Sequence, residues 1–219
     1  LWILHASLTG RYRWLLPLGF VYIWMYDALV LPLLVVGAYG AALLLLNRRF
    51  ALASVAYLTA GLLLGLLINP YFPNNVIFIY HHLLPKIIET TAVDVGGEWY
   101  PYDTWDLVEN SGLALLAFVA GTLALGLRER RMPVSTATLF FLAIGFGLML
   151  FKSRRFIEYF PAFALIFCAL AWQPLLATFQ QQRSRLAQAV PVALTVVFGL
   201  GIWFNVVELR QELRDSTSH

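Results

Sequence analysis

Three cations stand close together in the stretch FKSRRFIEYFP, residues 151–161, between two long apolar runs. They are Lys152, Arg154 and Arg155. The planar guanidinium of arginine can donate two hydrogen bonds to one phosphate, so these residues suit the binding of an anion such as a lipid phosphate. Glu158 shares the helical face of both arginines and can hold their side chains when no anion is bound. The alternative is that the cations pair with acidic residues of the segment 69–111.

A second group of candidates lies in the polar and aromatic segment from Asn69 to Ser111. Aromatic rings on which a sugar can stack, beside carboxylates that accept hydrogen bonds from hydroxyls, are what a sugar-binding surface needs. The same composition also fits a loop packed on lipid headgroups. Asp103 or Thr104 also fits the N-cap of a following helix, with Asp106 favoured in its first turn. The candidates in this segment are His81, Glu98, Trp99, Tyr100 and Asp103.

Histidines and carboxylates of this segment are possible metal ligands. His81 and His82 are adjacent, so in a helix their side chains point about 100° apart and cannot easily bind one ion together. A single histidine with Glu98 or Asp103 could contribute to a site for a divalent metal. The sequence contains no strong zinc-binding spacing, so no metal ligands are assigned.

The composition predicts an all-α, polytopic membrane protein. The chain has 219 residues, of which 60% are hydrophobic and 12% charged, too apolar for an ordinary soluble domain. Its apolar blocks approach the roughly 20 residues that a membrane-spanning helix needs. We expect about six spans, at residues 28–46, 51–68, 112–127, 134–151, 157–176 and 189–207. Residues 14–26 form an interfacial helix or the remains of a seventh span.

The distribution of charge predicts which end of each span faces the cytoplasm. Short basic connections at Arg48–Arg49, Arg128–Arg131 and Arg183–Arg185 alternate correctly along the chain, so all three can lie inside together. The acidic segment 69–111 then lies outside. The same alternation of spans places the turn with Lys152, Arg154 and Arg155 outside. This placement is against the rule that basic connections face the cytoplasm, and an anionic ligand at the turn would explain it. The cations are spread over membrane boundaries, so nucleic acid is not an expected partner.

These features divide the chain into five parts. We expect a partial N-terminal segment at 1–27, a two-helix hairpin at 28–68, an extracytoplasmic loop at 69–111, a four-helix bundle at 112–207 and an outer tail at 208–219. Residues 75–89 of the loop are predicted to form an amphipathic helix along the membrane surface. Five glycines are expected to permit close helix packing: Gly112, Gly121, Gly126, Gly145 and Gly147.

The segments INPYFPNN, VGGEWYPY and KSRRFIEYFPAF resemble parts of bacterial multipass proteins of the C-type (GT-C) glycosyltransferase and oligosaccharyltransferase-like superfamily. The likeness runs from about Asp27 to Glu208. It implies an enzyme of the bacterial inner membrane that takes a sugar from a polyprenyl-phosphate donor at the outer face. Basic residues bind the donor phosphate there, and an outer-loop carboxylate activates the acceptor or holds a metal.

Carried onto this chain, the resemblance implies a substrate site around Lys152, Arg154, Arg155, Glu158 and Tyr159, with His81, Trp99 and Tyr100 from the loop. Glu98 and Asp103 become supporting carboxylates. The main catalytic acid of such proteins lies in their first outer loop, which would precede Leu1, so we expect the chain to be the C-terminal part of a longer protein. The alternative is a non-catalytic membrane subunit that packs into a larger complex.

Overall fold

The computed structural model describes residues 1–88, 97–127 and 131–181, together with Val196 and Trp203. Every regular element in this part of the chain is a helix, as predicted. The chain divides into two compact units, Leu1–Trp172 and Gln173–His219. The predicted span 189–207 and the tail 208–219 lie outside the described residues, apart from Val196 and Trp203. So do most of the arginines of the second and third basic connections.

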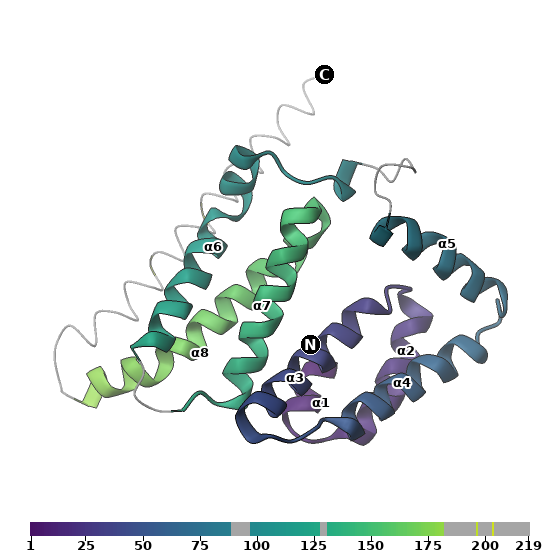
Figure 1. Cartoon of the computed structure of the whole chain (residues 1–219), viewed down its shortest axis with the longest axis horizontal. Helices are drawn as coiled ribbons and strands as arrows, with labels where there is room; N and C mark the ends of the chain where they lie inside the picture. The colour runs from purple at the N-terminus through teal and green to yellow at the C-terminus, as the bar shows by residue number, and fades with distance from the viewer. Residues whose placement is uncertain (89–96, 128–130, 182–195, 197–202, 204–219) are drawn as a thin grey trace. The chain divides into compact units, whose positions relative to one another are not determined.

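Four described helices are long and apolar enough to cross a membrane. They are α3 (Val30–Asn47), α6 (Thr104–Gly126), α7 (Val134–Lys152) and α8 (Phe160–Gln181), labelled in Figure 1. The apolar window of α8 is Phe160–Ala177. Helix α4 (Leu52–Leu67) is apolar but shorter. The prediction of an all-α protein with apolar helices that fit a membrane is therefore confirmed. The total of six or seven spans stays a prediction.

Helix α6 begins earlier than the predicted span. It starts at Thr104, inside the predicted loop, because Asp103 takes the extended backbone conformation of an N-cap and Asp106 lies in the first turn. An acidic residue there is favoured by the partial positive charge of the helix N-terminus. The residues before Gly112 were too polar to be recognised as part of a span by hydropathy alone.

The N-terminal residues form a small bundle. Helices α1 (Trp2–Leu8) and α2 (Leu15–Met25), with the 3-10 turn η1 (Tyr12–Trp14) between them, pack with α3 and α4 around a shared core. The segment expected at the interface is thus α2, which lies along α4. Glycines make this contact close: a Cβ on Gly19 would lie 2.9 Å from the Leu58 carbonyl oxygen, and one on Gly61 would collide with the backbone of Leu16.

Aromatic rings join α6, α7 and α8. The rings of Phe118, Phe140 and Phe167 contact one another, with centroids 5.2–5.9 Å apart. The indole nitrogen of Trp172 donates to the Ala120 carbonyl oxygen at 3.1 Å. Helix α7 also packs against α3. The buried centre of this part of the chain is therefore aromatic, and α7 is its most buried span.

Three of the five glycines predicted to permit close packing do so. A Cβ on Gly121 would lie 2.7 Å from the Phe167 ring, one on Gly145 would lie 3.3 Å from Leu34, and one on Gly147 would lie 3.1 Å from Phe160. At Gly112 the nearest atom belongs to Val108 of the same helix, at 3.5 Å, and at Gly126 nothing lies within 4 Å. The prediction is wrong for these two, because no atom of another helix lies within 4 Å of a Cβ at either position.

The predicted amphipathic helix is present as α5 (Asn74–Ile88). Its start is tied to the end of α4, because the Asn75 side-chain amide donates to the Leu66 carbonyl oxygen at 2.9 Å. This contact positions the first turn of α5 beside α2 and α4.

Candidate functional site

The loop segment 97–102 packs against the basic turn that follows α7. The turn is a 3-10 helix, η3 (Arg154–Glu158), and its neighbour is the short 3-10 helix η2 (Gly97–Trp99). Ser153 ends α7 in an extended conformation and caps η3, where its hydroxyl accepts from the backbone N–H of Arg155 at 3.3 Å. The same hydroxyl donates to the Glu98 carbonyl oxygen at 3.0 Å. A buried serine therefore joins the two segments.

Arg155 is the ionic centre of this cluster. Its Nη1 lies 2.7 Å from Oε2 of Glu98 and 3.9 Å from Oε1 of Glu158. Hydrogen bonds with Glu98 and with the Tyr26 side chain raise the pKa of Arg155 further above its usual range, so the guanidinium is always charged. The side chains of Arg155 and Glu98 remain 31% and 50% exposed, so this ion pair is open to solvent.

Arg154 has a different role from Arg155. Its backbone N–H donates to the Tyr100 carbonyl oxygen at 3.0 Å, and its Nε donates to the Pro101 carbonyl oxygen at 3.2 Å. Its guanidinium carbon lies 5.1 Å from the centroid of the Tyr102 ring, a cation–π distance. Among the described residues no ion pair joins Arg154 to Glu158, so the prediction that Glu158 holds both arginines is wrong for Arg154. Loop carbonyls hold that side chain instead.

Aromatic residues close the cluster on the side of α7. The Trp99 ring meets Phe156 edge to face at 6.4 Å, and the Tyr159 ring stacks on Phe146 at 5.2 Å. Burial and a hydrogen bond with Tyr26 raise the pKa of Tyr159 to about 12. Trp99 and Tyr159 therefore share a cluster with Arg155. Tyr100 contributes its carbonyl to Arg154, and its side chain is exposed.

The other predicted site residues lie around this cluster or away from it. Lys152 is the last residue of α7, where a cation complements the helix dipole. Asp103 is the N-cap residue of α6, and its exposed carboxylate makes no capping hydrogen bond. His81 is exposed on α5, where its ring lies beside Tyr80 rather than beside Arg155. No group of three potential metal ligands occurs among the described residues.

The sequence did not identify Ser153, Tyr26 and Tyr102 as members of the cluster. Ser153 could have been found, because a serine between a helix end and two arginines is a common N-cap. The contact of Tyr26 depends on a fold-level approach between distant segments, for which the sequence gives no signal. The parity of the spans did predict that the loop and the basic turn share one end of the bundle, and their hydrogen bonds confirm this.

No protein-family model, no curated protein and no solved structure matches the chain. The geometry alone defines a helical membrane protein with an arginine–carboxylate–aromatic cluster at one end of its bundle. The resemblance to the GT-C superfamily stays a prediction.

Proposed function

We propose that the chain is a membrane glycosyltransferase-like protein that binds a polyprenyl-phosphate-linked sugar at the extracytoplasmic face. The observation that carries the proposal is the contact between the turn with Arg155 and the loop with Glu98 and Trp99. It gathers a permanent cation, carboxylates and aromatic rings at one end of an apolar bundle. A lipid phosphate beside a sugar needs these groups, and the resemblance of the same segments to GT-C proteins points the same way.

Arg155 can bind a phosphate only if the phosphate displaces the carboxylate of Glu98. A solvent-exposed ion pair contributes about 0.2–1 kcal/mol, so opening the Arg155–Glu98 contact is inexpensive. Both carboxylates approach the same nitrogen, Nη1, whereas a guanidinium carries five N–H donors. A phosphate that binds in bidentate fashion therefore outcompetes Glu98, and Glu98 orients Arg155 when no phosphate is bound.

In the proposed transfer, the acceptor attacks the anomeric carbon while the bond from that carbon to the phosphate oxygen breaks. Arg155 stabilises the negative charge that develops on the leaving phosphate. Glu98, which the phosphate releases from Arg155, and Asp103 are the two candidates for a supporting carboxylate. Arg154 acts as a positioning residue that holds residues 100–102 in place.

The test measures binding of a polyprenyl phosphate to the full chain in lipid nanodiscs. Arg155→Ala should weaken binding by about tenfold or more, because one charge-assisted contact is worth roughly 1.5–3 kcal/mol. Arg131→Ala is the matched control, since Arg131 precedes the opposite end of α7. Equal binding by the two variants would refute the proposal. Arg154→Ala is a poorer probe because it also releases the loop.

The second candidate is a non-catalytic membrane subunit, and the pairing of Arg155 favours it. Glu98 and Glu158 already compensate part of the positive charge within the chain, so the cluster can act as a structural contact between loop and bundle. Under this proposal Arg155→Ala lowers the thermal stability of the chain and leaves phosphate binding unchanged. Copurification of a stable complex with the chain would support it.

A further inference from the structure

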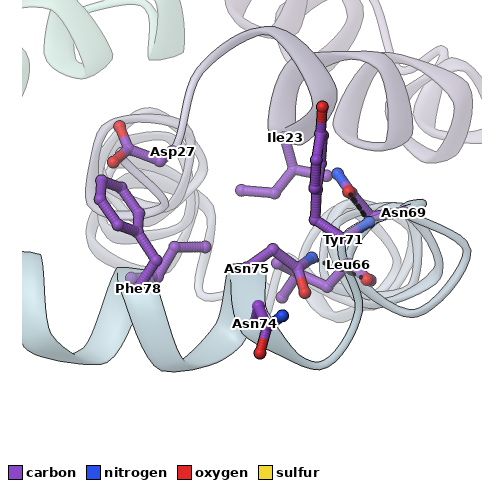
Figure 2. Close-up of a pocket in the computed structure, with 9 residues that line it drawn as sticks. Ile23, Asp27, Leu66, Asn69, Tyr71, Asn74, Asn75 and Phe78 are labelled. Atoms are coloured by element: carbon purple, nitrogen blue, oxygen red, sulfur yellow. Dashed lines mark hydrogen bonds between the residues drawn. The ribbon is translucent and has the colours of Figure 1, made fainter.

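A cavity of about 310 Å³ lies between α2, α4 and α5, separate from the arginine cluster. Its volume is at the lower end of the range found for small-ligand sites. Its floor is apolar and is formed by Ile23, Leu66 and Ile79. Figure 2 shows the polar and aromatic residues that line it: Asp27, Asn69, Tyr71, Asn74, Asn75 and Phe78.

Two side-chain amides of the cavity already take part in hydrogen bonds within the fold. The amide nitrogen of Asn75 donates to the Leu66 carbonyl oxygen at 2.9 Å, and the backbone N–H of Tyr71 donates to Oδ1 of Asn69 at 2.9 Å. Oδ1 of Asn75 is buried and accepts no hydrogen bond from the described residues. A buried acceptor in this state costs free energy until a donor reaches it. Because this oxygen is shielded from solvent, the choice of ligand depends on the charge of the cavity.

Charge narrows the class of ligand further. Among the described residues that line the cavity, Asp27 is the only carboxylate and no basic side chain is present. No ion pair of the described residues involves Asp27. A half-buried carboxylate attracts a cation and repels a phosphate or carboxylate. A primary ammonium group supplies three donors and one positive charge, and aromatic rings such as that of Tyr71 also favour a cation. A sugar would leave the charge of Asp27 uncompensated.

We propose that this cavity is a binding site for a primary ammonium group, held by the carboxylate of Asp27. The apolar floor accommodates the carbon chain that carries the ammonium. The ligand is either a free alkylamine or the headgroup of an aminophospholipid. The site shares no residue with the proposed phosphate site, although Tyr26, which bonds Arg155, precedes Asp27 in the chain.

The test titrates ethylammonium chloride into the full chain in phosphatidylcholine nanodiscs and measures binding by saturation-transfer NMR. We expect saturable binding that weakens about tenfold or more in Asp27→Asn. Asp106→Asn is the matched control, because it removes a carboxylate outside the cavity, in the first turn of α6. Arg155→Ala should also bind normally, so failure of this site is distinguishable from failure of the proposed function.

A second variant and a competition experiment complete the test. Ile79→Phe narrows the cavity and keeps Asp27, so it should also weaken binding if Asp27→Asn fails to fold. Competition by phosphatidylethanolamine in the nanodisc would assign the ligand to a lipid headgroup, and lack of competition would assign it to a free amine. Equal ethylammonium binding by Asp27→Asn and Asp106→Asn would overturn the proposal. Binding of glucose in the absence of ethylammonium binding would overturn it too.

Discussion

From the close contact between α2 and α4 we predict that Gly61→Ala lowers the stability of the protein. A Cβ added at this position would collide with backbone atoms of Leu16, including its carbonyl oxygen. Backbone cannot move aside as a side-chain tip does, so the two helices must separate. Four residues further along α4, a Cβ on Gly65 would meet Ile23 and lie 2.8 Å from the Phe20 carbonyl oxygen. Gly61 and Gly65 therefore form a small-residue face of the kind that brings helices into close contact.

The expected size of the effect follows from two opposing terms. Replacing glycine by alanine within a helix gains about 1 kcal/mol in helix propensity. Overpacking a tight contact costs typically 1–3 kcal/mol, and a collision with backbone belongs at the upper end of that range. Gly61→Ala should therefore lose about 1–2 kcal/mol of unfolding free energy. Gly37→Ala is the control, because a Cβ at Gly37 in α3 meets nothing within 4 Å and the variant should gain up to about 1 kcal/mol.

The assay is reversible unfolding of the purified chain in mixed micelles, followed by tryptophan fluorescence. Trp24 reports on this contact directly, because its indole nitrogen donates to the Gly65 carbonyl oxygen at 2.9 Å. Separation of α2 from α4 breaks that hydrogen bond and changes the emission of the folded state. If Gly61→Ala were as stable as Gly37→Ala, with unchanged emission, the close contact of α2 and α4 would be refuted.

Two further predictions concern the end of the bundle that carries the cluster. In a Cys168→Ala background, Gly97→Cys should react with a membrane-impermeant maleimide added outside the cell, and Gly126→Cys should not. The two positions lie on either side of α6, and both accept a Cβ freely. The reverse pattern would place the cluster in the cytoplasm. Because the folded-state pKa of Tyr159 is raised to about 12 from an ordinary value of 10.0, its contribution to stability is complete below pH 10 and is lost as the pH rises through 12. Tyr159→Phe should reduce that loss in alkaline unfolding experiments, and an unchanged pH profile would contradict the assignment.

Hydropathy and charge predicted the features that depend on local sequence. The apolar blocks located α3, α7 and the start of α8 to within a few residues, because membrane-spanning helices must be apolar along most of their length. Asparagines and prolines at the end of α4, followed by an amphipathic stripe, located α5. The predicted span 112–127 covered only the apolar part of α6, whereas Asp103 was correctly recognised as a candidate N-cap of this helix.

Contacts between distant segments could not be predicted in the same way. The sequence indicated that acidic loop residues could pair with the basic turn, but several carboxylates were available and nothing distinguished Glu98. The choice depends on Ser153, which fixes the Glu98 backbone beside Arg155. The spacing Gly61-Leu-Leu-Leu-Gly65 did carry a signal for close packing, and a search for paired glycines four residues apart would have found it.

The ion pairs of Arg155 change what can be inferred from the cations in this turn. Three cations without partners would be expensive to leave on the outer side of a membrane, and a ligand would then be needed to explain them. Glu98 and Glu158 lie beside Arg155, and the Tyr102 ring and the Pro101 carbonyl lie beside Arg154, so the fold itself compensates much of the charge. The predicted outward placement of the turn therefore needs no phosphate to explain it. The stronger support is that the Arg155 pair is exposed to solvent and easily exchanged, whereas a purely structural ion pair gains most when it is buried with every donor satisfied.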